Sequence, residues 1–128
     1  MFEKKVQYAE YLIKNAERKR DEYRNLEATI GEYMSHLIQC YQTNDRSGLE
    51  TAAKAIRRLG QTLPQQQVLF ANFEEYFAQG DLSKALGALS KINDYAIAEV
   101  QANRDFIQTI RLPLDVQRKV RLSQDKID

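Results

Sequence analysis

The chain has 128 residues, 43% of them hydrophobic and 29% charged, with 19 Lys and Arg against 18 Asp and Glu. Enough large apolar side chains are present to form a core, which excludes a disordered chain, and a net charge of +1 is far from the basic excess of a dedicated nucleic-acid binder. No stretch reaches the roughly 20 apolar residues of a membrane span, the first residues lack the apolar block of a secretory signal, and one Cys closes no intrachain disulfide, so we expect a cytoplasmic protein.

A long helix is predicted from residue 2 to about residue 43. The segment has no Pro, and its apolar residues recur every three or four positions, which is the period of a helix. The heptad pattern is interrupted in the middle, where Arg20 and Glu27 take core positions. About 42 residues at about 1.5 Å each give about 60 Å, more than the width of a compact domain of this size. We therefore expect that Gly31 kinks the helix or that part of it projects.

A second and a third helix are predicted between residues 45 and 80. Asp45 or Ser47 is placed to cap the second helix, and Glu50 completes a capping-box pattern with Ser47. The third helix begins at Pro64, a residue favoured in a first helical turn. It carries the most aromatic face of the chain, which includes Phe70, Phe73, Tyr76 and Phe77.

A fourth helix is predicted from Asp81, which would cap it, to the residue before Pro113. Gly87 inside this helix costs about 1 kcal/mol relative to Ala, so we expect it to pack tightly against a neighbour. The predicted domains are a single helical domain of residues 1–114 and a C-terminal tail of residues 115–128, either a short helix or disordered. Because short connections make consecutive helices antiparallel neighbours, the predicted fold is an all-α antiparallel bundle of about four helices.

The sequence also aligns weakly with itself at a shift of 36 residues. The alignment matches Tyr41 with Phe77, Asp45 with Asp81, and Ile56 with Ile92. The second copy, residues 73–92, reads F-E-E-Y-F-A-Q-G-D-L-S-K-A-L-G-A-L-S-K-I and resembles the turn and second helix of a tetratricopeptide repeat. The resemblance implies TPR-like helix pairs, although the Trp, Leu-Gly pair and closing Pro of that family are missing or displaced. An antiparallel hairpin with a Gly-Asp turn is the alternative.

Residues that usually carry catalysis or bind metals are scarce. Glu32 and the single His36 lie four positions apart, but two ligands do not form a metal site. Cys40 is expected to be a small buried apolar residue, since the chain has no second histidine to support a Cys-His nucleophile. The glycine patterns of phosphate-binding loops do not occur in the sequence, and adjacent carboxylates such as Asp21 and Glu22 point about 100° apart on a helix. We therefore predict no enzymatic activity, catalytic residue, metal, cofactor or small-molecule substrate.

The leading hypothesis is a non-enzymatic protein–protein interaction module, such as an adaptor, an assembly factor or a small chaperone-like subunit. The first helix is longer than a core of this size needs, and tyrosines combine an apolar ring with a polar tip, which suits contact surfaces. The partner would be another protein or a second copy of the chain, and it would bind along a face of this helix. The candidate contact residues are Phe2, Tyr8, Tyr11, Leu12, Tyr23 and Tyr33.

Two alternatives stay open. In the first, the chain is an obligate homodimeric scaffold in which two first helices pair, with Arg20 and Glu27 setting the register across the twofold axis. In the second, it is a small nucleic-acid-associated helical subunit whose binding weakens steeply with salt. The basic candidates for that role are Lys14, Arg18, Lys19, Arg24, Arg57 and Arg58. Acidic residues on the same stretch, such as Glu22 four positions after Arg18, favour a solvated helix face, so nucleic acid is not the expected partner.

Overall fold

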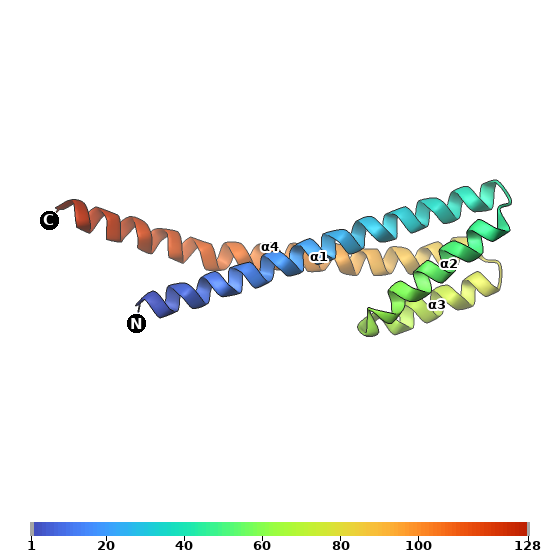
Figure 1. Ribbon diagram of the computed structural model, residues 1–128, viewed down its shortest axis with the longest axis horizontal. Helices are drawn as coiled ribbons and strands as arrows, with labels where there is room; N and C mark the ends of the chain where they lie inside the picture. The colour runs from blue at the N-terminus through green and yellow to red at the C-terminus, as the bar shows by residue number, and fades with distance from the viewer. Residues whose placement is uncertain (1, 128) are drawn as a thin grey trace. The chain divides into compact units, whose positions relative to one another are not determined.

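The computed structural model describes the backbone of residues 2–127 and the side chains of residues 3–113 and Asp115. Its elements are α1 (Phe2–Gln42), α2 (Arg46–Gln61), the short 3-10 helix η1 (Pro64–Gln66), α3 (Gln67–Ala78) and α4 (Leu82–Ile127), labelled in Figure 1. Within residues 2–127 there is no strand, so the predicted all-α fold of four helices with a long first helix is confirmed. None of the helices searched, over the described residues, is long and apolar enough to cross a membrane.

The chain forms two compact units, and both long helices contribute to each of them. Unit 1 combines the chain up to Arg24 with the chain from Ala98 onwards, and unit 2 is Asn25–Ile97. α1 is one uninterrupted helix through Gly31. The predicted interruption of its heptad pattern falls close to the boundary between the units, at a point where the helix changes from one core to the other.

Unit 2 contains the larger core. Its fully buried large side chains come from all four helices, and they are Ile30, Leu37, Ile56, Phe73, Leu89 and Ile92. α2 and α3 lie side by side (Figure 1). Arg57 on α2 donates two hydrogen bonds to the Glu74 carboxylate on α3, each 2.9 Å long, which fixes the register of the two helices.

Two turns of unit 2 repeat each other 36 residues apart. Asn44 in the α1–α2 turn and Gly80 in the α3–α4 turn both have a positive φ, 55° and 74°. The next residue in each turn is an Asp whose backbone N–H donates to the carbonyl five residues earlier, at 2.8 Å for Asp45 and 2.9 Å for Asp81. A positive φ combined with this hydrogen bond is a common way to end a helix. The 36-residue alignment of the sequence therefore corresponds to two equivalent turns.

The same two aspartates begin the helices that follow. The N–H of Gly48 donates to Asp45 Oδ1 at 2.8 Å, and the N–H of Lys84 donates to Asp81 Oδ1 at 3.1 Å. Each side chain thereby satisfies one of the free N–H groups at a helix start. Asp45 is the cap of α2, and the alternative of Ser47 as the cap is wrong, because Ser47 already lies inside the first turn of α2.

Two expectations about α4 are also wrong. The helix does not end before Pro113 but continues through it to Ile127, so residues 115–127 are part of this helix. A proline inside a helix removes one N–H, and the helix can continue with the loss of one backbone hydrogen bond and a kink. Gly87 does not pack tightly, because no neighbouring atom lies within 4 Å of the position that a Cβ would take there.

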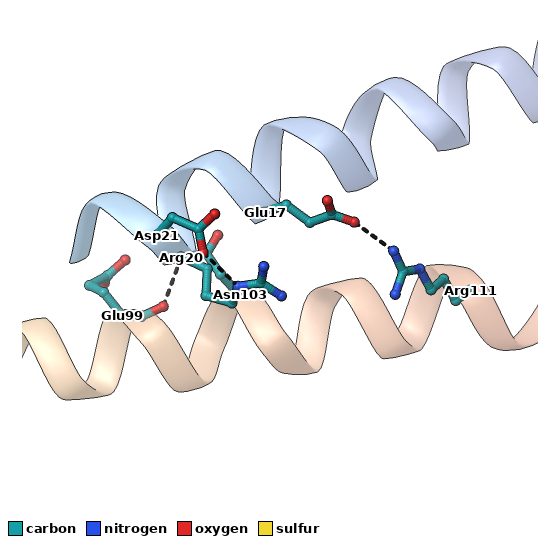
Figure 2. A network of polar contacts seen from close by, with 6 residues as sticks. All are labelled: Glu17, Arg20, Asp21, Glu99, Asn103 and Arg111. Carbon is teal, nitrogen blue, oxygen red and sulfur yellow. Dashed lines mark hydrogen bonds and ion pairs between the residues drawn. The ribbon is translucent and has the colours of Figure 1, made fainter. Parts of the chain in front are cut away.

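Unit 1 is built from the first part of α1 and the second part of α4, which run antiparallel (Figure 2). Ile13 and Ala16 on α1 are buried together with Ile107 on α4. Three partly buried residues extend this small core, namely Val6, Ala9 and Ile110. Arg111 also donates to Glu17 across the two helices at 2.5 Å, with more than half of the Arg side chain exposed.

Candidate functional site

The face of α1 that unit 1 leaves in solvent carries two tyrosines. Tyr8 and Tyr11 each expose 64% of their surface, although Ile13 and Ala16 on the other face of the same helix are buried. Large apolar side chains are usually buried when a protein folds. Two exposed tyrosine rings one helical turn apart therefore form a surface that favours contact with another molecule.

The two tyrosines belong to a longer stripe along the same face. Its members follow one another in steps of four and three residues, which is the spacing of a coiled-coil seam. They are here called the outer seam, and they are Lys4, Tyr8, Tyr11, Asn15, Arg18 and Glu22. Asn15 is half-buried and the other five are exposed. At about 100° per residue, the outer seam lies opposite the buried stripe that faces α4.

The two ends of the outer seam carry opposite charges. Lys4 stands at one end and Glu22 at the other, and neither forms an ion pair within the described part of the chain. Between them, Arg18 Nη2 donates to Asn15 Oδ1 at 2.8 Å. The predicted interaction between Arg18 and Glu22 is thus replaced by one between Arg18 and the amide one turn earlier, which leaves the carboxylate of Glu22 open to a partner.

The predicted contact residues differ in exposure and belong to different units. Tyr8 and Tyr11 lie in the outer seam, whereas Leu12 and Tyr23 are half-buried in unit 1. Tyr33 is half-buried in unit 2. The side chain of Phe2 lies outside the described residues. Of the predicted set, the two strongly exposed tyrosines are therefore the ones that form a common surface.

The two predicted register residues also belong to different units. Arg20 is in unit 1, where its Nε lies 3.2 Å from Asp21 Oδ1, so this guanidinium is paired with its own neighbour in sequence (Figure 2). Glu27 is half-buried in unit 2. Their proposed pairing across a twofold axis stays a prediction.

The basic candidates for nucleic-acid contact are likewise spread over both units. Four of them are exposed on the part of α1 in unit 1, and they are Lys14, Arg18, Lys19 and Arg24. The other two, Arg57 and Arg58, lie on α2 in unit 2. The hydrogen bonds from Arg57 to Glu74 raise the pKa of the guanidinium and occupy two of its donors. Arg57 is therefore engaged in holding α2 to α3.

A cavity of about 260 Å³ lies between the two equivalent turns of unit 2. It is lined by Tyr41, Arg46, Leu49, Glu50, Phe77, Gly80 and Leu82. These residues were not predicted as a site from the sequence, although the 36-residue alignment pairs two of them, Tyr41 and Phe77. Small-molecule sites usually enclose about 300–1,000 Å³, so this cavity is below that range.

Two side chains approach the one cysteine of the chain. Cys40 Sγ lies 3.5 Å from His36 Nε2 and 4.0 Å from Asp45 Oδ2. Cys40 is buried, as expected, and the one histidine of the chain lies beside it because residues four apart on a helix are neighbours. Burial, and to a lesser extent the Asp45 carboxylate, raise the pKa of the Cys40 thiol. Reactive cysteines usually have a lowered pKa, so the raised pKa gives no support to a nucleophilic role for Cys40. Among the residues searched, no group of three potential ligands could hold a metal ion.

Replacing Cys40 by Ala is expected to reduce the loss of stability at alkaline pH. Because the pKa of the thiol is raised by folding, the folded protein holds this proton more tightly than the unfolded chain does. The resulting stabilisation is complete below the ordinary thiol pKa of about 8.5 and is lost as the pH rises through the folded value. Thermal unfolding at about pH 7 and about pH 10 should show a larger fall in Tm for the natural chain than for Cys40→Ala. Equal falls would contradict the raised pKa.

We compared the chain with known proteins. No protein-family model, no curated protein and no solved structure matches the chain. The candidate site therefore depends on the geometry of the outer seam alone.

Proposed function

We propose that the protein is a non-enzymatic α-helical protein–protein interaction module that binds its partner along the outer seam of α1. The observation that supports this most directly is the 64% exposure of both Tyr8 and Tyr11 on a helix whose other face is packed. A tyrosine ring contributes much contact area, and its hydroxyl keeps a hydrogen bond at the edge of an interface. Burying the exposed part of one ring against a partner would contribute roughly 2 kcal/mol.

The small core of unit 1 also supports binding of a partner along α1. Among the described residues, its core is a small cluster of Ile13, Ala16 and Ile107 with a few partly buried neighbours, between two helix segments. Most of the stability of helices in proteins comes from packing an apolar face, so a two-helix pair gains when another helix packs on it. The outer seam offers that packing through side chains at coiled-coil spacing, and it requires no catalytic group.

Photo-crosslinking from the outer seam is expected to capture the partner directly. In one variant, p-benzoylphenylalanine replaces Tyr11, and the analogue is close to tyrosine in shape. In a control variant it replaces Val68, which is 74% exposed on α3 of unit 2. Irradiation of cells that make the protein should give a discrete protein adduct from position 11 and much less from position 68, as measured by mass shift on a denaturing gel. Equal yields from the two positions would contradict the proposal.

A further inference from the structure

We infer that the partner of the outer seam is a second copy of the chain, packed antiparallel to the first. This inference rests on the proposed function, since it names the occupant of the same face. Its basis is the order of the side chains along the seam, which read from Lys4 at one end to Glu22 at the other as base, two tyrosines, amide, base and acid.

When two copies of the outer seam lie antiparallel, each side chain faces one of complementary charge or hydrogen-bonding chemistry. In a twofold-symmetric pair of antiparallel helices, residue i of one copy faces residue j of the other, and residue j of the first faces residue i of the second. With the axis passing level with residue 13, the ends of the two seams meet as Lys4 with Glu22. The next pair is Tyr8 with Arg18, which allows a guanidinium to stack on a ring.

The central pair brings Tyr11 to Asn15, so the phenol hydroxyl meets an amide that can donate or accept a hydrogen bond. The hydrogen bond from Arg18 to Asn15 orients the guanidinium and the amide along the seam before a partner arrives. By symmetry, each of these pairs occurs twice in the dimer. The seam spans about 27 Å, or five turns of helix, from Lys4 to Glu22.

Charge selects this arrangement over a parallel one. In a parallel dimer each residue would face its own copy, so Lys4 would meet Lys4, Arg18 would meet Arg18 and Glu22 would meet Glu22. Like charges directly opposite each other are unfavourable, whereas the antiparallel register places opposite charges at both ends. A face that binds an unrelated protein does not need to be complementary to itself, whereas the face of an antiparallel homodimer does.

Charge exchange within the seam tests the inference. Self-association of the purified full chain is measured by sedimentation equilibrium at low ionic strength, where exposed ion pairs are least screened. Lys4→Glu and Glu22→Lys should each weaken the dimer at least tenfold, because symmetry makes every single reversal create two like-charge pairs. The double variant Lys4→Glu with Glu22→Lys should recover affinity to within about threefold of the natural chain, because both pairs are restored with exchanged signs.

A matched variant controls for net charge. Lys14→Glu makes the same change as Lys4→Glu on an exposed residue of α1 that lies off the seam, and it should leave the affinity within about threefold. Circular dichroism should show equal helix content in all variants, since Lys4 and Glu22 are both exposed.

The outcomes separate this inference from the proposed function. A monomer at all concentrations, single reversals without effect, or a double variant that stays weak would each overturn the antiparallel homodimer. If the adduct from position 11 then has a mass other than that of two chains, the seam still binds a protein and the proposed function stands. If position 11 gives no adduct at all, both fail.

Discussion

Replacing Phe73 by Ala is expected to destabilise unit 2 by about 3–5 kcal/mol. The side chain is fully buried and is one of the largest in the core. Its ring also stacks on that of Phe77, with centroids 5.7 Å apart and planes 24° from parallel. Truncation removes both the burial and the stacking, and it leaves a cavity in the tightly packed core of unit 2.

The exposed Val68 on the same helix provides the control for this substitution. Val68→Ala removes apolar atoms from a residue that is 74% exposed, so its effect should stay within about 0.5 kcal/mol. Urea unfolding followed by circular dichroism measures both variants against the natural chain. A loss below about 1 kcal/mol for Phe73→Ala would mean that the packing around this ring is looser than described.

Gly48→Ala is expected to destabilise the protein by about 1–3 kcal/mol, although Ala is the better helix former. A Cβ at this position would lie 2.6 Å from both Cys40 Sγ and Asp45 Oδ2. Cys40 is buried and can move little, and a shift of the Asp45 carboxylate would break its hydrogen bond to the N–H of residue 48, which caps α2. The glycine is therefore required by the close approach of α1 to the start of α2.

The same substitution at Gly87 should have the opposite sign. Gly87 lies inside α4 with no neighbouring atom within 4 Å of a Cβ, so Gly87→Ala should raise stability by up to about 1 kcal/mol through helix propensity alone. Thermal unfolding of the two variants in the same buffer gives the comparison. A gain at both positions would show that the start of α2 can move away from Cys40.

The fold could be predicted because its helices follow regular local rules. The three-and-four spacing of apolar residues predicted the helices, and the Asp after the second turn predicted the cap at Asp81. For the first turn the sequence left Asp45 and Ser47 as alternatives, of which Asp45 is the cap. The 36-residue alignment located two equivalent turns, since the hydrogen bonds of a turn depend on a few neighbouring residues. Such features are encoded within one or two helical turns of chain.

One feature that depends on distant contacts was missed, and so were two local ones. Whether Gly87 packs or stays open depends on the neighbours that α4 acquires, and the sequence of α4 alone does not contain them. The continuation of α4 through Pro113 contradicts a rule that is a tendency rather than a prohibition. The proximity of His36 to Cys40 follows from their spacing, since residues four apart on a helix are neighbours.

The candidate site also could be predicted only in part from the sequence. Tyr8 and Tyr11 could be selected from the sequence, but the outer seam could be defined only once Ile13 and Ala16 were known to face inward. Periodicity identifies a stripe on a helix, and it does not say which of two stripes meets the rest of the chain. Structure supplied that choice, and with it the order of charges from Lys4 to Glu22.

The division of the chain has a consequence for the order in which the protein forms during synthesis. Unit 2 is one continuous stretch, Asn25–Ile97, whereas the ion pair of unit 1 joins Glu17 to Arg111, 94 positions apart. A ribosome completes every residue of unit 2 before it reaches the partner of Ile13 on α4, and contacts between distant residues form more slowly than local ones. The buried face of the first part of α1 therefore stays unpacked until the ribosome has also made the segment around Ile107, well after unit 2 is complete.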